Sequence, residues 1–218
     1  AQAFECFQKS KSVAAKIYAR QGFDKQRYLG DVQLETDYLN QTLRAGWASP
    51  PFDPCKLVFL VGFPRSGTTL LDSILRSHPS IDVIEEQQML TLAASEMRRR
   101  ESATPGYLER LDAAELASLR QVYFDELRLH RDLSHPDALV IDKLPLNIML
   151  AGRIRVLFPE ARFIFALRDP RDCVLSCFMQ SFAPNSAMAN FLTLEDAAGL
   201  YDKVMRLWQD QQKLLQLS

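Results

Sequence analysis

Leu57-Val58-Phe59-Leu60-Val61, followed by Gly62-Phe63-Pro64-Arg65-Ser66-Gly67-Thr68-Thr69, is the stretch that decides the fold. An unbroken apolar run of this length is typical of a strand that is buried on both faces. The two glycines then bound a tight turn that leads into a helix. A strand, a glycine-bounded loop and a helix N-terminus together direct backbone N–H groups toward an anion. We therefore expect this loop to bind a phosphate or sulfate ester.

The residues inside the loop restrict which anion it suits. Loops that bind nucleoside triphosphates read G-x-x-x-x-G-K-[ST], in which the Lys contacts the outer phosphates and the Ser or Thr contacts magnesium. Gly62 and Gly67 have that spacing, but Thr68 stands where the Lys would be, and the positive charge is Arg65. This composition favours a singly charged sulfonate, which needs no metal to neutralise it. A tight turn with a capping glycine is the purely structural alternative.

Length, charge and cysteine usage limit the class of protein. The 218 residues carry a net charge of −1, which argues against a dedicated nucleic-acid binder, and no apolar run is long enough to span a membrane. No secretory signal is evident, so we expect a cytoplasmic protein, or a lumenal one if an anchor precedes this sequence. The four cysteines show no metal-ligand spacing, and we expect no metal. A homodimer is also considered.

Residues 1–55 are expected to form a helical segment and a linker. Residues 1–46 look helical, and Ala3 and Phe7 fit the A-x3-F fragment of a tetratricopeptide repeat. The sequence fits both a remnant of such a repeat and a plain amphipathic helix. Residues 47–55 contain three prolines, which block continuation of a helix and indicate a linker.

Residues 56–218 alternate between strand and helix patterns. The sequence predicts strands at 57–62, 81–84, 138–141 and 162–167. Helices are predicted after the loop, at 87–100, 112–130 and 146–157, from Pro170 with Asp169 as its N-cap, and at 194–216. In the first of these helices Leu70, Leu71, Ile74 and Leu75 are expected to share one buried face. The fold class is therefore α/β, a doubly wound, mostly parallel sheet with a P-loop-like anion-binding loop.

Polar residues follow the ends of all four predicted strands. They are Arg65-Ser66, Glu85-Glu86, Asp142-Lys143 and Arg168-Asp169. In a parallel sheet these ends lie along one edge, where ligands of doubly wound folds bind. Each pair alone is typical of a solvated surface, but four pairs at four strand ends indicate a site.

The chain resembles the sulfotransferases that use 3′-phosphoadenosine 5′-phosphosulfate (PAPS). Residues 63–69 are similar to the loop that binds the 5′-phosphosulfate in that family. Arg168-Asp169-Pro170-Arg171, with Ser176 eight positions after Arg168, is similar to its 3′-phosphate motif. Ser77-His78-Pro79 and Glu85-Glu86 further resemble the tyrosylprotein and bacterial tetratricopeptide-repeat branches.

This resemblance implies a role for each residue at the strand ends. The donor would be held by Arg65, Ser66, Gly67, Thr68 and Thr69 at its 5′ side and by Arg168 and Ser176 at its 3′-phosphate. Arg65 and Lys143 would stabilise charge on the transferring group.

The resemblance also implies that Glu86 takes the proton from an acceptor hydroxyl on a peptide tyrosine, a glycan or a small alcohol. Two adjacent, partly desolvated carboxylates can raise the pKa of one of them toward that of a useful base. The structural alternative is that Glu86 is simply an acidic residue at a helix N-terminus. Glu85 is the weaker candidate, because alternate strand residues point to opposite faces.

One departure from the family pattern concerns the end of the chain. A further strand with later donor-binding residues normally follows the last helix of the family, whereas this sequence stops at Ser218. We expect a truncated sulfotransferase-like domain over 56–218. A P-loop nucleotide kinase or NTPase, and a non-catalytic nucleotide-binding or interaction module, are the alternative functions.

Overall fold

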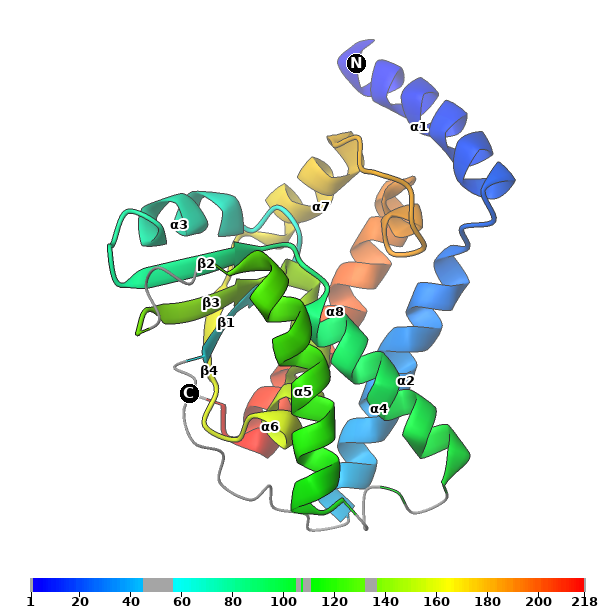
Figure 1. The fold of residues 1–218 in the computed structure, drawn as a ribbon. Helices are drawn as coiled ribbons and strands as arrows, with labels where there is room; N and C mark the ends of the chain where they lie inside the picture. Colours follow the sequence, from blue (N-terminus) through cyan, green and yellow to red (C-terminus); the bar gives the residue numbers. More distant parts are fainter. Residues whose placement is uncertain (1, 45–56, 105–106, 108–110, 132–136, 218) are drawn as a thin grey trace.

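A computed structural model describes residues 2–44, 57–104, 107, 111–131 and 137–217 (Figure 1). The linker predicted at 47–55 lies outside these residues. Everything below refers to the described part of the chain.

The centre of the fold is a four-stranded parallel sheet in the order β2-β3-β1-β4. Register pairs Glu85 with Lys143 and Gly62 with Ala166, so the carboxyl ends of the strands lie along one edge. The strands are β1 (Leu57–Gly62), β2 (Ile81–Glu85), β3 (Leu139–Lys143) and β4 (Arg162–Ala166). All four predicted strands are confirmed, each to within two residues at its ends.

Helices connect and precede these strands, and several begin where the sequence places a cap. Asp169 accepts a hydrogen bond from the Arg171 N–H and Pro170 opens the next helix, as predicted. Residues 145–150 form a 3₁₀ turn ahead of a shorter α-helix than expected. The helices are α1 (Gln2–Arg20), α2 (Lys25–Arg44), α3 (Thr68–Leu75), α4 (Met89–Ala103), α5 (Ala113–His130), η2 (Pro145–Leu150), α6 (Ala151–Leu157), α7 (Pro170–Met179), η3 (Met188–Phe191) and α8 (Leu194–Leu215).

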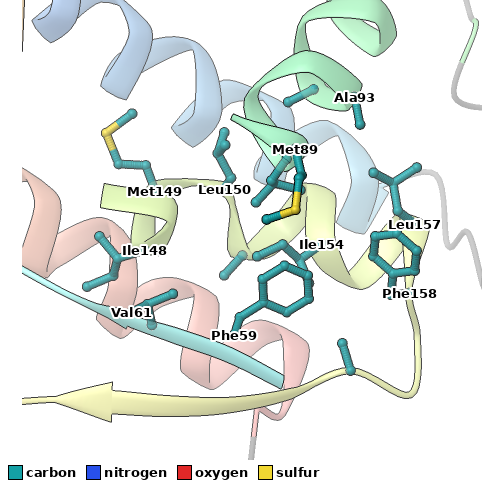
Figure 2. Packing of buried hydrophobic residues seen from close by; sticks show 14 of the residues in the cluster. Phe59, Val61, Met89, Ala93, Ile148, Met149, Leu150, Ile154, Leu157 and Phe158 are labelled. Atoms are coloured by element: carbon teal, nitrogen blue, oxygen red, sulfur yellow. The ribbon is translucent and has the colours of Figure 1, made fainter. Parts of the chain in front are cut away.

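The two faces of the sheet are covered unequally. Phe59 and Val61 of β1 point into the main core, where Figure 2 shows them against Ile148, Ile154 and their neighbours. Alternate residues Val58 and Leu60 point to the opposite face, and there α3 supplies the covering helix. A sheet with helices on both faces confirms the doubly wound architecture.

Only half of the predicted apolar face of α3 is buried. Leu71 and Leu75 pack against the sheet, whereas Leu70 and Ile74 are exposed, so the expectation that all four share a buried face is wrong. A single helix lying on a sheet buries one narrow stripe, and positions 70 and 74 fall on the other side of it.

The N-terminal helices differ in how closely they join the body of the molecule. α2 runs along α8 and buries Val32, Tyr38 and Leu39 in the main core, while α1 extends away from it (Figure 1). Glu35 of α2 also forms a buried ion pair with Arg153 of α6 at 2.7 Å. Because α1 and α2 do not lie side by side as a helix hairpin, the arrangement lends no support to a tetratricopeptide repeat. None of the described helices combines the length and apolarity of a membrane span.

Candidate active site

The loop after β1 has the backbone shape of an anion cradle. Arg65 and Gly67 both have left-handed backbones, with φ of 71° and 98°, and Ser66 N–H donates to the Phe63 carbonyl at 3.1 Å. Alternation of right- and left-handed residues turns successive N–H groups toward one concavity. Gly62 must be glycine, because a Cβ there would lie 2.7 Å from the backbone oxygen of Ala166. The first glycine of the loop pattern is therefore required for steric reasons.

The N-terminus of α3 completes this cradle. Gly67 is its N-cap and provides no side chain, so no side-chain hydrogen bond occupies the first-turn N–H groups. The Ser66 hydroxyl is buried and has no hydrogen-bond partner. Buried polar atoms are rarely left unpaired in native proteins, so an orphan hydroxyl in this loop indicates a place for a bound polar group.

The structure brings the two predicted donor motifs together. Arg65 Nε donates to Ser176 Oγ at 3.0 Å, and an Arg168 guanidinium nitrogen lies 3.4 Å from the Arg65 carbonyl oxygen. Arg168 is also paired with Asp172 at 3.2 Å, an exposed ion pair that costs little to open. Arg65 therefore meets Arg168 and Ser176, which lie 103 and 111 positions further along the chain.

A second cluster lies at the ends of β2 and β3. Lys143 Nζ donates to Glu85 Oε1 at 2.8 Å and to Glu86 Oε1 at 3.0 Å. The hydrogen bond from Lys143 holds the pKa of Glu85 below its usual value, so Glu85 is ionised at neutral pH. The prediction that Glu85 and Glu86 point to opposite faces is wrong. Glu86 leaves the strand with φ of 52°, which turns its side chain to the same ammonium as Glu85.

A pocket of 220 Å³ joins the two clusters. Its wall includes Arg65, Arg168 and Glu86. Gly67, Thr68 and Thr69 supply the helix N-terminus, and Pro64, Pro145 and Phe182 supply apolar surface. Phe182 belongs to the segment after α7. Sequence reasoning missed Pro145, although it lies only two positions beyond Lys143 at a strand end.

Lys143 itself does not line this pocket. Its side chain has no exposed surface, because Glu85, Glu86 and α3 enclose it. This differs from the prediction that Lys143 points at the donor, since two carboxylates hold its ammonium behind the pocket wall.

Asp142, the other polar residue at the end of β3, faces the main core. Tyr123 donates a hydrogen bond to it at 3.1 Å, and burial raises the pKa of Asp142 to about 7. Its carboxylate is directed away from the pocket because successive strand residues alternate faces. Within the described ranges, no group of three or more His, Cys, Asp or Glu side chains is arranged to hold a metal ion.

Comparison with known proteins gives independent information on this architecture. The model of the family described as "Sulfotransferase family" matches residues 58–217, which include the sheet except Leu57 and all the pocket residues.

Curated proteins with similar sequences come from animals and bacteria. Protein-tyrosine sulfotransferase 1 of Danio rerio is 32% identical over 146 residues, covering 63% of this chain and 41% of that protein. Nodulation protein NoeE of Sinorhizobium fredii is 31% identical over 122 residues, covering 52% and 29%. An uncharacterized protein of Aquifex aeolicus is 30% identical over 141 residues, covering 62% and 18%. The chain thus spans less than half the length of each of these relatives.

Proposed function

The chain belongs to the sulfotransferase family, and on that premise we propose that it transfers a sulfuryl group from PAPS to an acceptor hydroxyl. The observation that carries the proposal is that Arg65, Arg168 and Glu86 line one pocket. Two cations suit a donor with anionic groups at both its 5′ and 3′ ends, and a carboxylate in the same pocket suits proton removal from an acceptor.

The 5′ end of the donor would lie in the loop after β1. A phosphosulfate fits three features of this loop. They are the left-handed backbones of Arg65 and Gly67, the start of α3 with no side-chain cap, and the unpaired Ser66 hydroxyl. The Thr68 and Thr69 side chains belong to the same wall. Because these groups carry one positive charge among them, they fit the donor without a magnesium ion.

The 3′-phosphate would be held by Arg168 and Ser176. Both already lie within hydrogen-bond reach of Arg65, so the sites for the two ends of the nucleotide are linked. Arg168 would exchange an exposed partner, Asp172, for a phosphate, to which an arginine can donate two parallel charge-assisted hydrogen bonds.

In the reaction, Glu86 accepts the proton of the acceptor hydroxyl. The acceptor oxygen forms a bond to sulfur while the bond from sulfur to the 5′-phosphate oxygen breaks, and that oxygen leaves with the electron pair. Arg65 stabilises the charge that develops on the leaving phosphate. Lys143 positions Glu86 through the 3.0 Å hydrogen bond, and the apolar wall of Pro145 and Phe182 limits the access of water.

The acceptor is proposed to be a hydroxyl on a peptide tyrosine, with a glycan or a small alcohol as alternatives. One of the similar proteins is named as a protein-tyrosine sulfotransferase, which supports a tyrosine acceptor. The apolar residues beside Glu86 fit an aromatic ring as well as they fit a sugar face.

Calorimetric titration with 3′-phosphoadenosine 5′-phosphate, beside magnesium-ATP, tests the donor. Sulfotransfer predicts tight binding of the first nucleotide and none of the second. Binding of magnesium-ATP alone would instead indicate a kinase or NTPase. Transfer from ³⁵S-labelled PAPS to a tyrosine peptide, an oligosaccharide or phenol then tests the reaction. Nucleotide binding with no transfer to any of them would indicate a non-catalytic module.

A further inference from the structure

The ammonium of Lys143 has two carboxylates within hydrogen-bond distance, although one would neutralise it. Glu85 lies 2.8 Å away and Glu86 3.0 Å away. The lysine side chain is fully buried, whereas 48% of the Glu85 side chain and 57% of the Glu86 side chain are exposed. A buried cation needs a counter-charge, because an unpaired charge away from water is strongly destabilising. The question is why the fold supplies two.

The two carboxylates differ in what else they touch. Glu86 lines the pocket, whereas Glu85 is absent from its wall and lies 3.7 Å from the guanidinium of Arg76, the residue that follows α3. The Glu86 N–H also donates to the Lys143 carbonyl at 2.7 Å, so the turn that separates the two side chains is fastened to β3. Glu86 therefore belongs to the pocket wall, whereas Glu85 is shared between Lys143 and Arg76 outside it.

The proposed reaction consumes only one of these charges. When Glu86 accepts a proton it becomes neutral, and Lys143 then loses one of its two close counter-charges. We propose that Glu85 is a positioning residue that keeps the buried Lys143 ammonium compensated and in place while Glu86 takes up and releases the proton. This inference rests on the proposed function, because it assigns Glu86 as the base.

No other described carboxylate lies within hydrogen-bond distance of the Lys143 ammonium. Asp72 of α3 is 3.9 Å from Nζ and is already bonded to Arg76. The other charged residues of the pocket wall are Arg65 and Arg168, which are cations and would repel Lys143. Among the described residues, Glu85 is thus the carboxylate that stays hydrogen-bonded to Lys143 when Glu86 is neutral, while Asp72 remains at 3.9 Å.

Two substitutions at Glu85 separate its charge from its shape. Glu85→Gln keeps the size and a carbonyl oxygen that can accept from Lys143, but removes the charge. Glu85→Asp keeps the charge and shortens the side chain. Steady-state transfer from ³⁵S-labelled PAPS to a tyrosine peptide is measured for both variants. Glu160→Gln is the matched control, because Glu160 is exposed just before β4, at the opposite edge of the sheet.

We expect Glu85→Gln to lower kcat on the order of 10- to 100-fold, with the KM for PAPS changed less than about threefold. Glu85→Asp should retain more of kcat than Glu85→Gln, and Glu160→Gln should match the unsubstituted chain. The reverse order of the two Glu85 variants, a loss confined to KM, or kcat within about twofold of the unsubstituted chain for both would overturn the proposal.

Folding is checked by thermal unfolding. Should Glu85→Gln not fold, it is combined with Lys143→Met, which removes the need for a counter-charge. The double variant is then expected to fold, and its failure to fold would also overturn the inference. An unsubstituted chain that neither binds 3′-phosphoadenosine 5′-phosphate nor transfers sulfate refutes the proposed function itself, whereas an active chain insensitive to Glu85 refutes only this inference.

Discussion

Replacing Glu86 by Gln is the sharpest test of the chemistry proposed for the pocket. The amide has nearly the same size as the carboxylate and keeps an oxygen that can accept the 3.0 Å hydrogen bond from Lys143. Glu85 stays bound to Lys143 at 2.8 Å, so the buried ammonium keeps a counter-charge. What the variant loses is the ability to take a proton from the acceptor.

The expected loss is set by what a positioned general base contributes. Such bases typically accelerate reactions 10²- to 10⁴-fold, so kcat should fall by about that factor, equivalent to about 2.7–5.4 kcal/mol of activation free energy. Stability should change by less than about 1 kcal/mol, because the Glu86 side chain is more than half exposed. Affinity for 3′-phosphoadenosine 5′-phosphate should be unchanged or slightly higher, since a negative charge leaves a pocket that holds Arg65 and Arg168.

Three measurements on one preparation decide the outcome. They are the rate of ³⁵S transfer under saturating PAPS, the dissociation constant of 3′-phosphoadenosine 5′-phosphate by calorimetry, and the midpoint of thermal unfolding. A folded variant that binds the nucleotide normally and keeps kcat within about fivefold of the unsubstituted chain would refute the assignment of Glu86 as the base. Equal losses of nucleotide binding and rate would instead indicate that Glu86 shapes the donor site.

Three further predictions concern the donor site and the core. Arg168→Ala should weaken 3′-phosphoadenosine 5′-phosphate about 10- to 100-fold and leave adenosine 5′-phosphate unaffected by calorimetry, and equal losses for both nucleotides would contradict the 3′-phosphate assignment. Gly62→Ala should lower the free energy of unfolding by about 1–3 kcal/mol in urea titrations, because its Cβ would lie 2.7 Å from the Ala166 oxygen. Burial raises the pKa of Asp142 to about 7, above its usual 3.8, so the folded protein binds a proton there more readily than the unfolded chain. The contribution of this group to the free energy of unfolding should therefore fall as pH rises from about 4 to 7. Asp142→Asn should flatten that part of the pH profile of the unfolding temperature. An unchanged profile would contradict the raised pKa.

The elements of the fold could be predicted from local sequence patterns. The apolar run 57–61 predicts β1 because only a strand buried on both faces has no polar position. Asp169 and Pro170 fix the start of α7. The Asp169 carboxylate caps a free N–H group of the first turn, and Pro170 has no N–H that would need a partner there. The convergence of four strand ends followed from parallel pairing alone, and the register of Glu85 with Lys143 and of Gly62 with Ala166 confirms it.

Side-chain direction was less predictable at the point where a strand ends. Alternation assigned Glu85 and Glu86 to opposite faces, but the left-handed backbone of Glu86 cancels the alternation after one residue. No residue type marks this turn, because glutamate rarely adopts a positive φ. The same limit applies to α3, where spacing grouped Leu70 with Leu71 although only Leu71 meets the sheet.

The sequence by itself determined the loop, its arginine and the order of strands and helices, because these depend on residues close together in the chain. Tertiary structure alone decided that Lys143 lies buried between two carboxylates and that Arg65 meets Ser176. It also decided that α2 joins the core through the pair of Glu35 with Arg153. These contacts link residues that are 57 to 118 positions apart, and their partners are chosen by how the sheet and its helices pack rather than by any local pattern.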